Sequence, residues 1–170
     1  YQRIEDLAGK SLVFADPNST SGFLVPSFFL RSEGFEYRRH FSRHGFAGGH
    51  DAVVLAVVNG TYDAGAISYR SAEHNVAAGL ERRGMIPADS YRMIWQSPVI
   101  PAPPWTARKD LPEELKAELR EAMLALQAED PKAWEALTGG RSQSMLPTEH
   151  GMYEGIIAMR KEAQQQRRSR

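Results

Sequence analysis

SLVFADPNSTSGFLVP, the stretch at residues 11–26, decides the fold of this chain. It opens with a short apolar run that ends at Asp16 and Pro17, a pattern typical of a buried β-strand leading into a loop. Small hydroxyl residues and Gly22 follow, and then a second apolar segment whose hydrophobic positions suit one face of a helix. The stretch therefore predicts a strand, a loop and a helix, with the helix N-terminus at the loop.

The alternation of strand and helix continues along the chain. Apolar runs predict further strands at residues 41–46, 64–68 and 92–97. Helices that end near glycines are predicted at residues 23–30, 52–58 and 72–83. The segment at residues 52–58 is entirely apolar, so periodicity alone does not show whether it is a strand or a helix. We favour a helix that ends at Asn59 and Gly60. This order predicts an α/β fold with a largely parallel sheet.

The chain changes character after residue 97. Four prolines stand in residues 98–104. Beyond them we expect a short strand at residues 105–108 and helices at residues 112–127, 131–137 and 149–165. A helical segment with little sheet of its own is hard to close into an independent core. We therefore expect two parts, residues 1–97 and residues 98–170, of which the second resembles half of a larger domain.

Composition excludes several classes of function. The 21 Lys and Arg residues balance the 21 Asp and Glu residues, so the chain lacks the basic surface of a nucleic-acid binder and we expect no nucleic-acid partner. Without cysteine there is no disulfide, thiolate metal site or cysteine nucleophile, which fits an exported bacterial protein as well as a cytosolic one. No apolar stretch approaches the roughly 20 residues of a membrane span, and the first residues do not resemble a signal peptide. Either the protein is not exported or the chain starts after a removed segment.

The segment Ser19-Thr20-Ser21-Gly22 has two interpretations. Ser and Thr are preferred N-cap residues, so the segment can be an ordinary helix cap. Alternatively, hydroxyl and backbone N–H groups of Ser19, Thr20 and Ser21 bind the oxygens of a phosphoryl-type anion, and Gly22 lets the backbone approach it closely. Taken alone, the segment does not decide between them.

A second helix start favours the anion site. His50 and Asp51 stand directly before the apolar run at residues 52–58. His50 alone can be a cap or a surface residue, and Asp51 is explained as an acid that complements the helix dipole. However, two helices that start on neighbouring strands of a parallel sheet open at the same edge, where ligands of α/β sheets collect. Together the two motifs predict a site for a tetrahedral oxyanion.

Catalytic and metal sites are weaker interpretations. A serine-dependent phosphoesterase would use Ser19 or Ser21 as nucleophile and His50 as base, but neither serine lies in a Gly-x-Ser-x-Gly turn. His40 and His44 are four positions apart in an arginine-rich, strand-like segment, and the five histidines show no paired metal-ligand spacing. We expect no catalysis, no metal and no cofactor.

Several motifs together resemble one family. They are DLAGKSLVF at residues 6–14, DPNSTSG at 16–22 with Pro26, HDAV at 50–53, DAGA at 63–66, SPVIP at 97–101 and RKDLP at 108–112. This set is similar to the phosphonate- and phosphite-type substrate-binding proteins of bacterial ABC transporters, over nearly the whole chain. The serine-threonine motif with the later histidine is its specific part, whereas the last motif is generic among binding proteins.

The resemblance implies a type 2 periplasmic-binding-protein-like fold, with two α/β lobes that close on a ligand about hinge strands. On this pattern residues 1–97 are the complete second lobe. Residues 98–170 are the hinge return and the C-terminal helical part of the first lobe, whose N-terminal portion lies outside the chain. Such proteins work in the periplasm and deliver the ligand to an ABC transporter permease in the membrane. A ligand-sensing domain of a regulatory protein with the same fold is the alternative.

The resemblance also assigns individual residues. It implies that Ser19, Thr20, Ser21 and His50 hold the phosphonate oxygens. Members that bind aminoalkylphosphonates carry acidic groups where this chain has Ser68-Tyr69-Arg70 and Ala102-Pro103-Pro104, so an ammonium group finds no obvious partner here. Arg70 can instead face a second anionic group or a more highly charged oxyanion, or it can cap the next helix at the surface. The expected ligand is a small phosphorus oxyanion or an organophosphonate.

Overall fold

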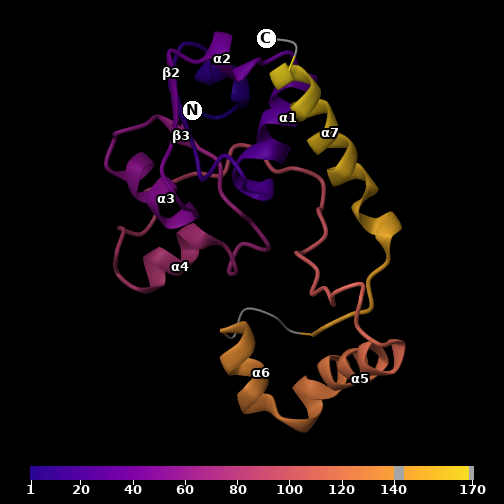
Figure 1. The fold of residues 1–170 in the computed structure, drawn as a ribbon. Helices are drawn as coiled ribbons and strands as arrows, with labels where there is room; N and C mark the ends of the chain where they lie inside the picture. The colour runs from indigo at the N-terminus through magenta and orange to yellow at the C-terminus, as the bar shows by residue number, and fades with distance from the viewer. Residues whose placement is uncertain (140–143, 169–170) are drawn as a thin grey trace. The chain divides into compact units, whose positions relative to one another are not determined.

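The computed structural model describes residues 1–139 and 144–168, whose elements are labelled in Figure 1. The chain divides into two compact units. The sheet unit is formed by Tyr1–Ile100 and Glu154–Arg170, and the helical unit by Pro101–Tyr153. The sheet unit carries both helix starts that the sequence singled out.

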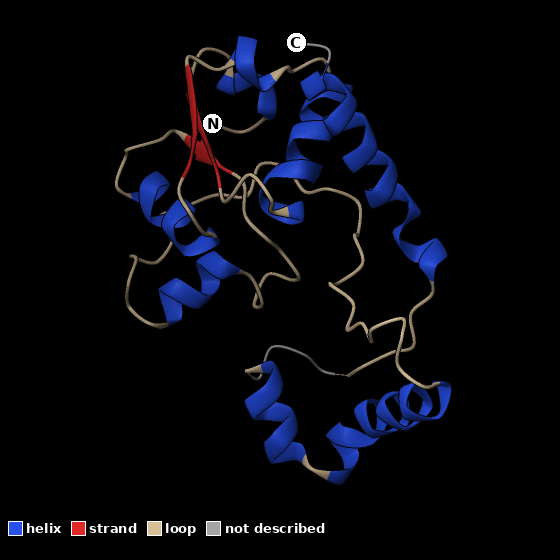
Figure 2. Ribbon diagram, in the orientation of Figure 1, coloured by secondary structure: helices blue, strands red, loops and turns tan. Residues whose placement is uncertain are grey.

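Three strands form a parallel sheet in the described part of the sheet unit (Figure 2). They are β1 (Ser11–Phe14), β2 (Arg43–Phe46) and β3 (Ala64–Gly65), in the order β2-β1-β3. Leu12 of β1 lies opposite His44 on one side and Ala64 on the other. All of β1 is buried, as expected for the central strand of a parallel sheet. The predicted α/β fold with a parallel sheet is confirmed.

Helices cover both faces of this sheet. Phe14 packs with Phe23 on one face, whereas Val13 packs with Val53 on the other, because successive strand residues point to opposite sides. The described helices of the sheet unit are the 3-10 helix η1 (Ile4–Leu7), the π-helical turn η2 (Thr20–Leu24), α1 (Val25–Ser32), α2 (Tyr37–His40), α3 (His50–Val58), α4 (Val76–Arg82) and α7 (Glu154–Arg168).

Gly65 allows α3 to lie directly against the sheet. A Cβ atom built on this residue would stand 2.4 Å from Cγ1 of Val53 and 3.1 Å from Cγ1 of Val13. Real Cβ atoms do not approach other atoms so closely, so a larger residue would push the helix away from β3. The glycine of the predicted strand therefore has a packing role.

The predicted helix boundaries are largely confirmed. The glycines expected to end three helices, Gly34, Gly60 and Gly84, have φ values of 84°, 71° and 66°, the left-handed conformation typical of such ends. The helix expected at residues 72–83 starts later, at Val76, because the side chain of Asn75 accepts a hydrogen bond from the N–H of Ala78 at 2.9 Å and caps it there.

The prediction of a strand at residues 92–97 is wrong, and the strand at residues 64–68 is shorter than expected. β3 comprises only Ala64–Gly65, and the structure assigns no strand to residues 92–97. A cavity of about 840 Å³ is lined by Gly65 and Ala66 and also by Ile94 and Trp95. Among the described residues, no β-bridge joins residues 92–97 to β3, so they lack the ladder that a strand requires.

A carboxylate ties the N-terminal residue to the beginning of the sheet. The side chain of Asp63 accepts hydrogen bonds from the N–H of Ser11 at 2.9 Å, from its hydroxyl at 2.7 Å and from the hydroxyl of Tyr1 at 2.9 Å. The hydrogen bonds from Ser11 come first among the causes that lower the pKa of Asp63 from 3.8 to about 2. This network joins the starts of β1 and β3.

The Asp63 network predicts a loss of stability in acid. Because the pKa of Asp63 is lower in the folded chain than in the unfolded one, its contribution is present above pH about 4 and disappears as the pH falls towards about 2. Asp63 is exposed, so solvent screening limits the expected contribution to the order of 1 kcal/mol. Urea unfolding at both ends of this pH range measures the free energy of unfolding, which should fall more for the native chain than for Asp63→Asn. Equal falls in the two proteins would contradict the assignment.

The C-terminal helix returns to the sheet unit. α7 lies beside α1 in Figure 1, and the guanidinium group of Arg31 on α1 joins the two helices. Its Nη2 donates to Oε1 of Glu162 at 2.7 Å and its Nη1 to Oε1 of Gln166 at 2.6 Å. The last helix thus braces the helix that follows the serine-threonine segment.

The helical unit contains α5 (Glu113–Glu129), α6 (Pro131–Thr138) and the 3-10 helix η3 (His150–Tyr153). The helices predicted at residues 112–127 and 131–137 are confirmed, whereas no strand forms at residues 105–108. The helix predicted at residues 149–165 is split into η3 and α7. Trp134 is buried, but α5 leaves Leu115, Leu119 and Leu124 exposed.

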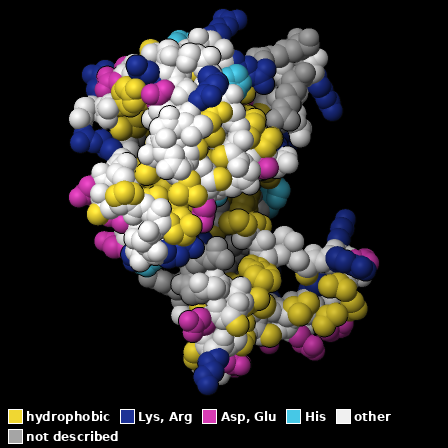
Figure 3. Space-filling model, turned by 90° about the vertical axis from the view of Figure 1, so that its left-hand side faces the viewer, with side chains coloured by type: hydrophobic (Ala, Val, Ile, Leu, Met, Phe, Trp, Pro, Cys, Tyr) yellow, Lys and Arg dark blue, Asp and Glu magenta, His cyan; other side chains and the backbone are white. Residues whose placement is uncertain are grey.

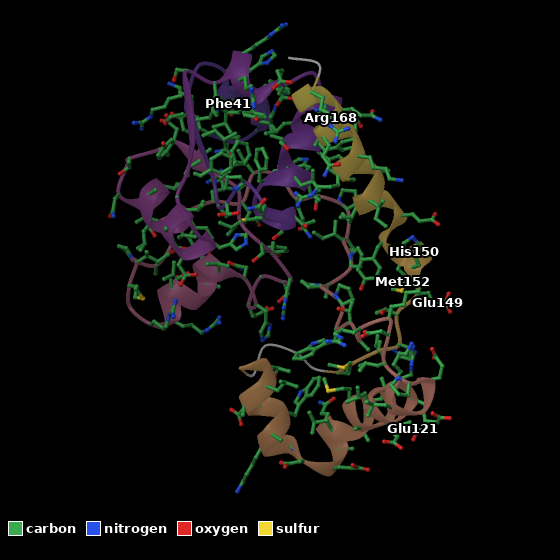
Figure 4. The ribbon with its side chains drawn as sticks, viewed as in Figure 1. Phe41, Glu121, Glu149, His150, Met152 and Arg168 are labelled. Carbon is green, nitrogen blue, oxygen red and sulfur yellow. The ribbon has the colours of Figure 1, made fainter. Side chains whose placement is uncertain are left out.

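The surface carries charges of both signs. Basic and acidic side chains both occur on the face shown in Figure 3, in keeping with the equal numbers of the two in the chain. Figure 4 labels Phe41 of the sheet unit and Glu121 of α5. Apolar Phe41 is buried and charged Glu121 is exposed, as their polarity predicts. No helix among the described residues is long and apolar enough to cross a membrane.

Candidate anion-binding site

Two helix N-termini follow neighbouring strands of the sheet. η2 begins after β1, and α3 begins at His50 after β2. Because β1 and β2 are parallel and paired, both helices begin at the edge of the sheet where these strands end. This edge is the usual ligand site of open α/β sheets, and helix N-termini present N–H groups to anions.

The first turn of η2 has both a cap and spare donors. Oγ of Ser19 accepts a hydrogen bond from the N–H of Gly22 at 3.0 Å, so Ser19 is a helix cap. Among residues 1–139 and 144–168, no hydrogen bond is donated by the hydroxyl or backbone N–H groups of Thr20 and Ser21. The cap interpretation is therefore confirmed for Ser19, whereas anion binding by Thr20 and Ser21, whose donors have no partner among the described residues, stays a prediction.

His50 is half-buried at the first position of α3. Its Nδ1 accepts a hydrogen bond from the backbone N–H of Ser68 at 3.1 Å. Burial lowers its pKa below the usual 6.5, although the nearby charge of Asp51 acts in the opposite direction. The imidazole is therefore neutral at pH 7. Nε2 has no hydrogen-bond partner among the described residues. Every fully buried side-chain nitrogen or oxygen among these residues does have a partner, so Nε2 is not fully buried and is accessible to solvent.

Gly22 brings the two helix starts into contact. A Cβ atom at this position would lie 2.8 Å from Cε1 of His50 and 2.5 Å from Cβ of Ala15. The imidazole ring therefore lies against the first turn of η2. The structure thus brings together two motifs that are 28 positions apart in the chain, Gly22 and His50.

Asp51 and Arg70 are placed differently. The carboxylate of Asp51 forms an ion pair with Arg83 at 3.2 Å, and both side chains are more than half exposed. This arrangement suits the interpretation of Asp51 as an acid of the first helical turn. Arg70 is exposed in the segment after β3, and together with Ser21 it lines the cavity of about 840 Å³.

Sequence reasoning missed the contact made by Ser68. This residue follows β3 and reaches His50 through its backbone N–H, which no side-chain motif reveals. The one available signal was topological, because a residue just after a third parallel strand lies at the same edge as the other two helix starts.

The contacts of the serine-threonine segment and of the acidic and histidine side chains bear on the catalytic and metal interpretations. No hydrogen bond among them joins His50 to Ser19 or Ser21, as a nucleophile and base would require. Within the same residues, no three His, Asp or Glu side chains are grouped so that they could hold a metal ion.

Comparison with known proteins identifies relatives. A family model described as "ABC transporter, phosphonate, periplasmic substrate-binding protein" matches residues 1–153. The chain is 28% identical over 159 residues to a probable ABC transporter phosphite binding protein, PhnD1, of Prochlorococcus marinus, with 90% of this chain and 52% of that protein covered. It is 29% identical over 169 residues to the phosphate-import protein PhnD of Mycolicibacterium smegmatis, with 90% and 51% covered. The phosphonates-binding periplasmic protein of Escherichia coli is 34% identical over 109 residues, with 63% and 30% covered.

Solved structures show the same fold. PhnD1 from Prochlorococcus marinus, in complex with methylphosphonate, matches with a TM-score of 0.75 and 25% identity, over 94% of this chain and 59% of that one. A Xanthomonas citri protein bound to a chloride ion matches with a TM-score of 0.68 and 19% identity, over 100% and 63%. The chain spans about half the length of the first two curated relatives. Since the family model covers residues 1–153, the chain belongs to the family of periplasmic substrate-binding proteins of phosphonate ABC transporters, which are binding proteins and not enzymes.

Proposed function

We propose that this chain is part of the solute-binding component of an ABC importer, which captures a phosphonate, phosphite or phosphate-like oxyanion in the periplasm and delivers it to a membrane permease. The observation that carries the proposal is the group of donors at the two helix starts. The hydroxyls of Thr20 and Ser21 and the solvent-accessible side of the His50 ring lie where two helix N-termini meet. Such groups hold an anion by hydrogen bonds and helix dipoles without a lysine cluster.

The ligand class follows from the donors. The named relatives are described for phosphite, phosphate and phosphonates, which share a tetrahedral phosphorus with several acceptor oxygens. The backbone N–H of Ser19 donates to the carbonyl of Asp16 at 3.0 Å and its Oγ accepts from Gly22, so Ser19 contributes the proton of its hydroxyl. Asp51 contributes the backbone N–H of the first turn of α3, because its carboxylate is occupied by an ion pair. Gly22 permits the close approach, and Arg70 provides the positive charge for a second anionic group.

We also propose that residues 1–97 are the complete second lobe of such a protein and residues 98–170 the hinge return and C-terminal part of the first. Two features support this proposal. The sheet lies within residues 11–65, and the chain matches 59% of the methylphosphonate-bound relative. The rest of the first lobe, with its ligand contacts, lies outside this chain.

A thermal-shift and calorimetry panel tests the function. Phosphate, phosphite, methylphosphonate and 2-aminoethylphosphonate are added to the protein, with sulfate as a tetrahedral control, because a ligand that binds only the folded state raises its melting temperature. At least one phosphorus compound should raise it more than sulfate does. The absence of a shift with all four would refute the proposal.

Variants test the site. His50→Ala and Thr20→Val are each expected to weaken binding by about 1–3 kcal/mol, because each removes hydrogen bonds to a charged group. Ser32→Ala is the matched control, since the hydroxyl of Ser32 bonds the carbonyl of Phe29 at the other end of α1. If both variants bound the ligand with native affinity, the anion site would not lie at this edge of the sheet.

A further inference from the structure

The two ring nitrogens of His50 have different surroundings. Nδ1 lies 3.1 Å from the backbone nitrogen of Ser68. A backbone N–H can only donate, so Nδ1 must accept and therefore carries no proton. In a neutral imidazole the proton then resides on Nε2, which has become a fixed donor.

The surroundings of the ring keep it neutral. The ring is half-buried between the first turn of η2 and the segment after β3, and this burial disfavours the imidazolium form. Asp51, the neighbouring acid on α3, pairs with Arg83 at the end of α4.

We propose that the backbone N–H of Ser68 is a positioning group that fixes His50 as an Nε2–H donor and thereby selects a deprotonated ligand oxygen at this point of the site. This inference rests on the proposed function. Thr20 and Ser21 can donate or accept through their hydroxyls, but His50 in this form can only donate at Nε2. The oxygen of a protonated P–OH group can still accept from Nε2–H, but it is a weaker acceptor than a charged oxygen, so a ligand that turns this group towards Nε2 loses the charge-assisted part of the hydrogen bond.

Nuclear magnetic resonance of the ligand-free protein reads this arrangement directly. Long-range ¹H–¹⁵N correlation of a neutral histidine distinguishes the protonated nitrogen from the bare one. We expect a protonated Nε2 and a bare Nδ1 for His50. A protonated Nδ1 in the native chain overturns the inference, whatever the ligand panel shows.

Two variants of Ser68 separate its N–H from its hydroxyl. Ser68→Ala keeps the backbone N–H and should leave both the tautomer and the affinity for methylphosphonate unchanged. Ser68→Pro has no N–H; it should shift His50 towards a mixture of tautomers and weaken methylphosphonate binding by about twofold, because only the fraction of chains that keeps the proton on Nε2 is competent to bind. An unchanged tautomer in Ser68→Pro would show that residue 68 does not position the ring.

Substitutions of His50 test the donor without altering Ser68. Gln can place an amide N–H near the position of Nε2, whereas Asn can replace only the acceptor at Nδ1. We expect His50→Gln to retain more of the methylphosphonate affinity than His50→Asn, which should resemble His50→Ala. Equal loss in Gln and Asn variants counts against the donor role. If no phosphorus compound binds the native chain, the proposed function fails, but the tautomer measurement still stands or falls by itself.

Discussion

Gly22→Ala is expected to weaken methylphosphonate binding roughly a hundredfold and to lower the free energy of unfolding by about 1–3 kcal/mol. The new methyl group would lie 2.5 Å from Cβ of Ala15 and 2.8 Å from Cε1 of His50. Ala15 is buried directly after β1, so we expect the first turn of η2 and the His50 ring to separate and make room for the methyl group. Both halves of the proposed site are then displaced at once. Calorimetric titration and urea unfolding measure the two effects.

Gly79→Ala is the matched control for this prediction. Gly79 also lies in a helix, α4, but a Cβ atom there would meet nothing within 4 Å. Because alanine is the better helix former, the control should be neutral or more stable by about 0.5–1 kcal/mol. If Gly22→Ala behaved like Gly79→Ala in both measurements, the contact between the two helix starts would be wrong.

Phe14→Ala is expected to lower the free energy of unfolding by about 3–5 kcal/mol, the usual cost of a large cavity in a core. Phe14 is fully buried in the central strand. Its ring stands 5.1 Å from that of Phe23, 5.2 Å from that of Tyr37 and 5.9 Å from that of Phe46, so its loss removes one ring contact from each of three aromatic neighbours. Such a loss is a large fraction of the roughly 5–15 kcal/mol that stabilises a typical domain.

Chemical denaturation with two further variants checks this value. Phe14→Leu fills most of the space and should cost clearly less than Phe14→Ala. Val99→Ala changes a side chain that is 96% exposed and should stay within about 0.5 kcal/mol of the native chain. A cost for Phe14→Ala as small as that for Val99→Ala would show that β1 is not the centre of the core.

Local signals were sufficient where the chain forms its own partners. The run at residues 11–15 predicted β1, and Gly34, Gly60 and Gly84 gave helix ends, because left-handed conformations strongly favour glycine. The run at residues 92–97 also predicted a strand, but a strand needs a neighbour to pair with, and no β-bridge joins this run to β3 among the described residues. The sequence pattern indicates whether a segment has strand character, but not whether a neighbouring strand is present to pair with it.

The site was predictable to the extent that it depends on topology. The rule for parallel sheets placed the serine-threonine segment and His50 at one edge, and the contact of Gly22 with the ring agrees with that placement. Their role in binding an anion stays a prediction. The bond from Ser68 to His50 involves a backbone group, which every residue possesses, so composition could not single it out. The ion pair of Asp51 with Arg83 depends on the packing of α3 and α4, which periodicity does not specify.

The brace between α1 and α7 has a consequence for how the protein is made. Arg31 and Glu162 are 131 positions apart, and the helical unit is encoded between them. Because a ribosome releases the N-terminal end first, β1 and α1 emerge long before their last partner exists. The sheet unit can assemble partially during synthesis, but it closes only after α7 has been translated. Nascent chains that stop before Glu154 therefore expose the side of α1 that α7 covers, and chaperones or proteases have their longest access there.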